Sequence, residues 1–168
     1  EDEIYFTSGG SESDNWAIRG LAEKYPTKKH IITSKIEHKA ILNVCEYMKT
    51  NGYDITYLDV DKHGFVSKTE LEESIRPDTL LVSIMYANNE IGTIQDIQCL
   101  CDITQKKNVF FHTDAVQILG KIDINVKKLG IDMMSLSAHN IHGFKGVGAL
   151  YINKSINIAP LIIGGEQE

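Results

Sequence analysis

The stretch TLLVSIM (residues 79–85) decides the fold class of this sequence. It is almost entirely apolar, whereas a half-exposed strand would alternate apolar and polar residues. Such a run is typical of a strand that is buried on both faces, as in a parallel sheet covered by helices. The polar run NNEIG (residues 88–92) follows it. We therefore expect a central strand of a parallel sheet here, with polar groups at its carboxyl end.

The segments on either side alternate between strands and helices. Short apolar runs predict strands, and longer amphipathic runs predict helices. The predicted strands are residues 4–7, 30–33, 55–58, 79–85, 109–112, 131–136 and 147–152, and the predicted helices are residues 12–25, 39–49, 67–75 and 96–106. This order predicts an α/β fold with a mostly parallel sheet flanked by helices.

The composition is that of a globular domain and argues against several classes of protein. The chain has 168 residues, of which 42% are hydrophobic and 24% charged, and one domain usually has ~150 residues. The sequence contains no run of ~18 apolar residues, which a membrane-spanning helix would need. The net charge of −6 argues against nucleic acid as a partner. The three cysteines, Cys45, Cys99 and Cys101, do not make a complete disulfide framework, so we expect a reduced, cytoplasmic location.

The amino-terminal end of the chain predicts a fragment of a longer protein. Residues 1–3 are acidic where a signal peptide would be basic. There is no initiator methionine, and residues 4–7 already have the pattern of a core strand. We therefore expect residues 1–168 to begin inside a domain.

Polar residues follow the predicted strands, where ligands bind in folds of this kind. Residues 8–12 combine two glycines with a helix start, which suits a phosphate or is simply a flexible turn. Asp114 can hold a protonated ring nitrogen, although Asp is also a common helix N-cap. His38 is either a functional or a capping residue, and residues 88–92 are equally consistent with an Asn-rich turn.

Taken together, these strand ends suit one particular ligand. They offer a phosphate cradle, an acid for a ring nitrogen, donors for a ring oxygen and a partner for an aromatic ring, which are the needs of pyridoxal phosphate. A metal site is an alternative for His112, Asp114, His139 and His142, but their spacing matches no tight zinc signature.

Five segments resemble motifs of the NifS/IscS-like cysteine desulfurases, which belong to the class V aminotransferase group of fold type I pyridoxal-phosphate enzymes. Residues 7–15, TSGGSESDN, resemble the family's TSGATESDN. Residues 137–150, SAHNIHGFKGVGAL, resemble the segment SxHKxxGPKGxGAL, which carries the cofactor lysine. The other segments are SKIEHKA (34–40), NNEIG (88–92) and HTDAVQ (112–117). The resemblance covers essentially the whole chain.

The resemblance implies a binding site for pyridoxal 5′-phosphate. It implies that His38 stacks on the ring and takes part in proton transfer, and that Asp114 pairs with the ring nitrogen. The remaining implied cofactor-binding residues are Gly10 and Ser11 at the phosphate, Ser137, Ala138 and His139 near it, and Asn89 and Gln117 at the phenolic oxygen.

The resemblance also implies a reaction and partners. In the family, sulfur is removed from L-cysteine, which leaves alanine and a persulfide on a mobile-loop cysteine of the enzyme. The sulfur then passes to an iron–sulfur scaffold or another sulfur-acceptor protein, and family members are homodimers. Residues 1–168 are then the central part of the large cofactor-binding domain, without the N-terminal arm and the C-terminal small domain.

Several features depart from the family pattern. Asn140 occupies the position of the cofactor lysine, and an amide cannot replace its amine; Phe144 replaces a proline. The persulfide cysteine is expected beyond residue 168. Lys145 matches a second lysine of the motif, so we interpret it as structural, and we interpret the three cysteines as packed or surface thiols. We therefore expect non-covalent cofactor binding at best and an inactive chain.

Two alternative functions remain open at this stage. One is a different class V enzyme, such as a selenocysteine lyase or an aminotransferase, although the SESDN and NNEIG runs argue against it. The other is a non-catalytic protein that binds the cofactor or a partner, which Asn140 favours.

Overall fold

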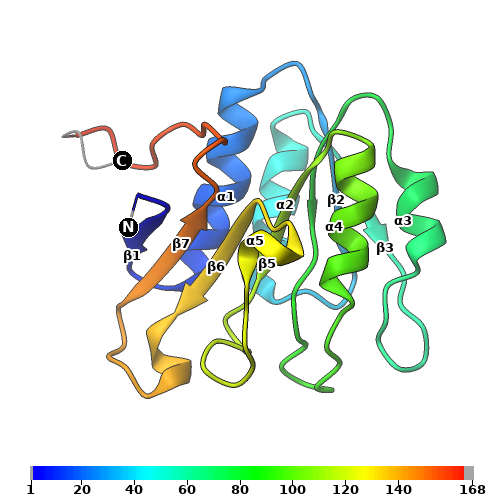
Figure 1. Cartoon of the computed structure of the whole chain (residues 1–168). Coiled ribbons are helices and arrows are strands. Elements are labelled where there is room, and N and C mark those ends of the chain that lie inside the picture. Colours follow the sequence, from blue (N-terminus) through cyan, green and yellow to red (C-terminus); the bar gives the residue numbers. More distant parts are fainter. Residues whose placement is uncertain (1, 165–168) are drawn as a thin grey trace.

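The computed structural model describes residues 2–164, and Figure 1 shows the chain. The elements follow one another in the order β1 (Ile4–Thr7), α1 (Gly10–Lys24), β2 (His30–Ser34), α2 (Lys39–Thr50), β3 (Asp54–Leu58), α3 (Lys68–Ser74), β4 (Thr79–Ser83), α4 (Ile97–Lys106), β5 (Phe110–Asp114), α5 (Val126–Leu129), β6 (Met133–Ser137), the 3-10 helix η1 (Ala138–Ile141) and β7 (Gly148–Ile152).

Within residues 2–164 the strands form one seven-stranded sheet in the order β1-β7-β6-β5-β4-β2-β3. β7 runs antiparallel to both of its neighbours, β1 and β6. All other neighbouring strands are parallel. The predicted α/β fold with a mostly parallel sheet is therefore confirmed.

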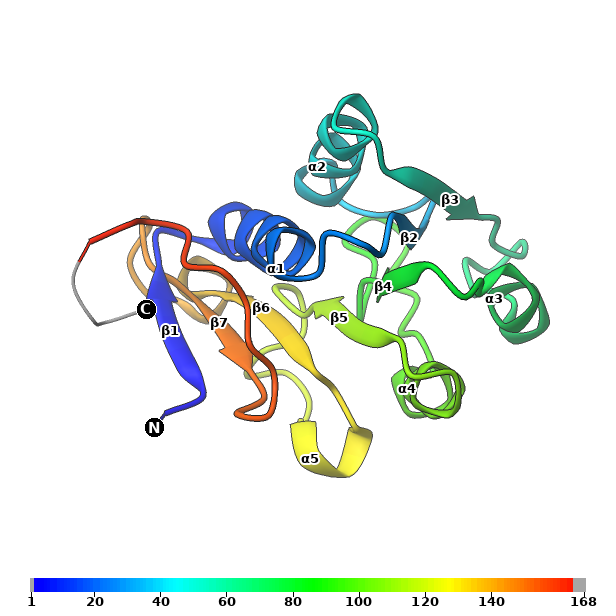
Figure 2. The same ribbon diagram turned by 90° about the horizontal axis from the view of Figure 1, so that it is seen from above.

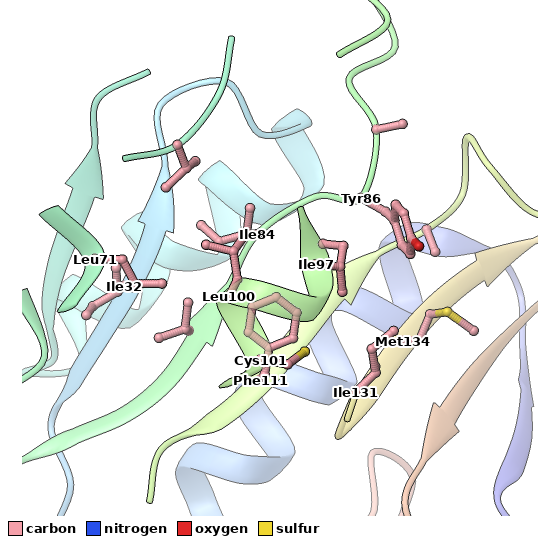
Figure 3. Packing of buried hydrophobic residues seen from close by; sticks show 14 of the residues in the cluster. Ile32, Leu71, Ile84, Tyr86, Ile97, Leu100, Cys101, Phe111, Ile131 and Met134 are labelled. Carbon is pink, nitrogen blue, oxygen red and sulfur yellow. The ribbon is translucent and has the colours of Figure 1, made fainter. Parts of the chain in front are cut away.

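Helices cover both faces of this sheet, as Figure 2 shows from above. α1 and α2 lie on one face, where buried residues such as Trp16 and Ile41 pack with Leu81. α3, α4 and α5 lie on the other face. There Leu100 of α4 and Phe111 of β5 belong to a second apolar cluster, part of which is drawn in Figure 3. The sheet is thus buried on both sides, as the TLLVSIM run predicts.

Several element boundaries differ from those that the sequence predicts. β4 ends at Ser83 rather than at residue 85, because the backbone N–H of Met85 donates to the carboxylate of Glu37 at 2.9 and 3.0 Å instead of to a strand. β5 extends to Asp114, so this aspartate ends the strand instead of following it. α1 begins at Gly10, two residues before the predicted start. The short helices α5 and η1 were not predicted, because one turn of helix has no clear periodicity.

Ser67 caps the start of α3. The Ser67 hydroxyl oxygen accepts a hydrogen bond from the backbone N–H of Glu70 at 3.2 Å. The Glu70 carboxylate does not complete a reciprocal capping box, since it accepts from the backbone N–H of Asp59 at 3.3 Å.

Replacing Ser67 by alanine is expected to lower the free energy of unfolding by about 1 kcal/mol, because the N–H of Glu70 loses its acceptor. Urea denaturation followed by circular dichroism measures this change. Ser67→Asp is the matched control, and it is expected to keep most of the stability because a carboxylate also caps a helix start. Equal losses in both variants would contradict a capping role.

A bilayer crossing would require a long, apolar helix, and residues 2–164 contain none.

Candidate active site

A cavity of about 140 Å³ lies at the carboxyl ends of the parallel strands. Of the ten residues predicted for the site, nine line it: Gly10, Ser11, His38, Asn89, Asp114, Gln117, Ser137, His139 and Asn140. Ala138 lies beside the cavity, where its carbonyl accepts from the backbone N–H of Gly143 at 2.9 Å. The parallel topology brings these segments together, because each of them follows or ends a strand.

The start of α1 forms one wall of this cavity. A Cβ atom added to Gly10 would lie 2.7 Å from Cγ2 of Val116, and one added to Gly148 would lie 2.5 Å from Cα of Gly9. These glycines therefore let the chain after β5 and the start of β7 approach the helix closely. Because the first N–H groups of a helix have no partner within it and carry partial positive charge, this wall suits an anion.

Asp114 provides an acidic group at the end of β5. Its Oδ1 accepts from the backbone N–H of Val116 at 3.0 Å, so the capping-type interaction considered from the sequence is present as well. Burial raises the pKa of this carboxyl, while the hydrogen bond from the Val116 N–H opposes that rise. Asp114 is buried yet lines the cavity, so it can meet a cation or a protonated nitrogen there.

His38 is held at the cavity by a hydrogen bond with Ala40 and by the anchoring of the preceding Glu37. Its Nδ1 accepts from the backbone N–H of Ala40 at 3.1 Å, which makes it the N-cap of α2. The preceding Glu37 is buried and accepts from the Ser34 hydroxyl at 2.6 Å as well as from Met85. Burial raises the pKa of Glu37 to about 8. This buried anchor fixes the loop that places His38 at the cavity wall.

The residues at the end of β6 interact with one another and with the loop after β5. Ser137 Oγ and His139 Nδ1 lie 2.7 Å apart. The Asn140 amide nitrogen donates to the Val116 carbonyl at 3.0 Å. The position that the family motif gives to a lysine therefore does face the cavity, but here it carries an amide.

The two asparagines of the NNEIG run have different environments. Asn88 Oδ1 accepts from the backbone N–H groups of Glu90 and Ile91 at 2.9 and 3.0 Å, so Asn88 stabilises the turn. Asn89 lines the cavity. Gln117, three residues after Asp114, lines it as well. Asn88 therefore supports the turn interpretation, whereas a binding role for Asn89 stays a prediction.

The structure does not support a metal site at His112, Asp114, His139 and His142. His112 is fully buried, and its ring nitrogens lie 2.8 Å from Ser83 Oγ and 2.9 Å from Ser135 Oγ. Within residues 2–164, no group of three or more His, Cys, Asp or Glu side chains is placed to hold a metal ion.

The whole chain, residues 1–168, matches the family model described as "Aminotransferase class-V". The chain belongs to the class V aminotransferase family. It is 57% identical over 169 residues to the cysteine desulfurase IscS of Methanosarcina thermophila, which covers 100% of this chain and 42% of that protein. It is 50% identical to the putative cysteine desulfurase IscS 1 of Bacillus subtilis (strain 168), covering 100% of this chain and 45% of that protein.

Solved structures of similar fold support the assignment of this chain to the class V aminotransferase family. A NifS-like protein superposes with a TM-score of 0.94 at 47% identity, covering 98% of this chain and 46% of that one. A structure described as SspA in complex with cysteine has a TM-score of 0.94 at 46% identity, covering 98% and 49%. The resemblance to the IscS/NifS-like branch is confirmed, and the chain spans less than half the length of these relatives.

Four residues that line the cavity were not predicted from the sequence. Asp14, Met85, Ala87 and Val116 also line the cavity. Asp14 could have been found, because it lies four residues after Gly10 on the same face of a helix. The other three are apolar, and nothing in their residue type distinguishes them from ordinary core residues.

The cysteines of this class V chain lie in helices, away from the residues that line the cavity. Cys45 of α2 and Cys101 of α4 are buried. Burial raises the pKa of Cys45 to about 12 and also raises the pKa of Cys101. Such thiols are poor nucleophiles, because the thiolate is the reactive form.

Proposed function

We propose that this chain is the pyridoxal-phosphate-binding core of a cysteine desulfurase and that, with Asn140, it binds the cofactor without a covalent bond. The observation that carries the proposal is that one and the same cavity has a helix start suited to an anion on one wall and the buried acid Asp114 on another. Class V aminotransferases use pyridoxal phosphate, whose phosphate and ring nitrogen match these two features.

The residues of the cavity fit the phosphate end of this cofactor. Gly10 has no room for a side chain beside Val116, so its backbone forms the surface of the cavity there. We assign the phosphate to Gly10, Ser11 and the segment Ser137, Ala138 and His139. Hydroxyl, imidazole and free backbone N–H groups are suitable donors to a phosphate.

The residues around the ring have separate roles in this proposal. Asp114 holds the ring nitrogen in its protonated form, and Asn89 and Gln117 donate to the phenolic oxygen. His38 stacks on the ring, and since its Nδ1 accepts from Ala40, its Nε2 is the nitrogen available for proton transfer. When bound, pyridoxal phosphate supplies an electron sink for the substrate amino acid.

The proposed substrate of the whole enzyme is L-cysteine. Its support is the similarity to proteins named cysteine desulfurase and to a structure described as containing cysteine. We propose a homodimer that passes sulfur to an iron–sulfur scaffold or another acceptor in the cytoplasm. In this arrangement residues 1–168 are the central part of the large domain.

Asn140 supports a second candidate, a non-catalytic protein that binds the cofactor or a partner. Its amide donates to the Val116 carbonyl and offers no amine to the cavity. We expect no cysteine turnover from the chain with Asn140, because the family reaction needs the amine. Measured turnover would rule out this second candidate.

Replacing Gly10 by valine is expected to weaken the binding of pyridoxine 5′-phosphate about tenfold or more, because the new side chain overlaps Val116 at the phosphate wall. This probe lacks the aldehyde, so it cannot react with surface lysines. Isothermal titration calorimetry measures the affinity, and circular dichroism verifies the fold.

Gly164→Val is the matched control, since a Cβ there would meet no atom within 4 Å. Unchanged affinity in a folded Gly10→Val variant would contradict the phosphate site. Failure of the unmodified chain to bind the probe at all would contradict the proposed function.

A further inference from the structure

Asp14 is a buried carboxyl group in the wall of the cavity for which the proposed function gives no role. It lies on α1 one turn after Gly10 and lines the same cavity. Only 1% of its surface is exposed. Within the described part of the chain, its Oδ1 has no hydrogen-bond partner. A buried carboxylate with an unsatisfied oxygen is costly, so burial favours the neutral form of this group.

The groups that face Asp14 do not neutralise a negative charge. From β5, Nε2 of His112 lies 3.8 Å from Asp14 Oδ1, but burial lowers the pKa of His112 to about 3, so this ring is neutral. Asp114 of β5 and Glu37 before α2 are acids, and β6 contributes only the hydroxyl of Ser135. Burial first, and then the charge of Asp114, raises the pKa of Asp14 well above its usual value.

The two aspartates of the cavity differ in how well they can carry a charge. Asp114 accepts a hydrogen bond from the Val116 N–H at 3.0 Å, which opposes the rise in its pKa. Asp14 has the neutral Ser135 hydroxyl as a donor, which opposes the rise in its pKa less than burial promotes it, and its Oδ1 has no partner among the described residues. When two nearby acids compete, the better-solvated one ionises and the other keeps its proton. The charge therefore belongs on Asp114.

We propose that Asp14 is a positioning residue that keeps its proton, so that the pair Asp14 and Asp114 presents one negative charge, on Asp114, to the cofactor ring nitrogen. This inference rests on the proposed function, because it assigns Asp114 to that nitrogen. A single charge matches one pyridinium, whereas two buried negative charges would repel each other.

The first test is the pH dependence of stability in the chain without cofactor. Above the unfolded-state pKa of ~3.9, folded Asp14 keeps a proton that unfolded Asp14 loses, so this residue makes stability fall as the pH rises. Asp14→Asn removes that dependence. We expect the folded-to-unfolded ratio of the variant, relative to the unmodified chain, to rise at least about tenfold between pH 5 and pH 8.

Asp123→Asn is the control for this measurement, because Asp123 is an exposed aspartate and its variant should show no such rise. Chemical denaturation at each pH gives the ratios. Groups common to both proteins cancel in the comparison. A pH-independent destabilisation by Asp14→Asn would overturn the proposal, because it would mean that Asp14 has only a structural role.

The second test is the affinity for pyridoxine 5′-phosphate at pH 7. Asparagine resembles a protonated aspartate, so we expect Asp14→Asn to weaken binding by less than about threefold and Asp114→Asn to weaken it by about tenfold or more. An equal or larger loss from Asp14→Asn would overturn the assignment of the proton to Asp14. No binding by the unmodified chain would instead refute the proposed function, and with it the role of the pair.

Discussion

Replacing Asn140 by lysine is expected to give a protein to which pyridoxal phosphate becomes covalently attached when borohydride is added, whereas the unmodified chain is expected to show no such attachment at this position. Residue 140 lines the cavity on η1, so a side chain ending in a primary amine there can reach the aldehyde of a bound cofactor. Mass spectrometry of the reduced protein measures the attachment, and peptide mapping locates it.

Two further variants make this result specific. Asn140→Gln keeps the amide and should remain unlabelled. Lys145→Ala in the lysine variant should leave the labelling intact, because Lys145 is exposed and is not among the residues lining the cavity. Attachment to Lys145 in the unmodified chain would show that our interpretation of Lys145 is wrong. No cofactor binding by the lysine variant would show that this chain alone does not form the site.

The lysine variant is still expected to release no sulfide from L-cysteine. Cys45 and Cys101 are buried with raised pKa values, and Cys99 lies with Cys101 on α4. None of the three lines the cavity. A sulfide assay with a reducing agent present measures this directly.

Replacing Phe111 by alanine is expected to lower the free energy of unfolding by about 3–5 kcal/mol. Phe111 is fully buried in the central strand β5 and packs beside Leu100 and Cys101 of α4 (Figure 3). Removal of the ring leaves a cavity that a packed sheet fills only in part. Because natural domains have only about 5–15 kcal/mol of stability, a large fraction of the protein should unfold at moderate urea concentrations.

Phe144→Ala is the matched control, since Phe144 is 86% exposed. We expect that change to alter the free energy of unfolding by less than about 0.5 kcal/mol. Urea titrations followed by fluorescence and by circular dichroism should give coincident transitions. Equal effects of the two substitutions would mean that the core on the α4 face contributes little to stability.

The fold was predictable because each strand carries its own signal. The apolar run at residues 79–85 predicts a strand buried on both faces, and β4 has every residue buried. The antiparallel direction of β7 was not predictable, since strand direction depends on the connection through η1 and the loop before Gly148 rather than on the residues of the strand. The exact end of β4 depended on Glu37, which is distant in sequence.

The site was predictable to the extent that it follows from strand ends. His38 follows β2, Asp114 ends β5 and Ser137 ends β6, and the parallel topology brings them together. Asp14 was missed although its spacing of four residues from Gly10 places both on the same face of α1. The Asn140 contact with Val116 was also beyond sequence reasoning, because two separate loops form it.

The pairing of β1 with β7 has a consequence for how the protein is made on the ribosome. Ile4–Thr7 pair with residues 148–151, and Gly148 packs against Gly9 just before α1. The amino-terminal strand must therefore wait, without its partner, until nearly the whole of this chain has been synthesised. The helix start next to it, which forms one wall of the cavity, is therefore fixed only after residue 148 has been made, and contacts this distant in sequence are slow to form.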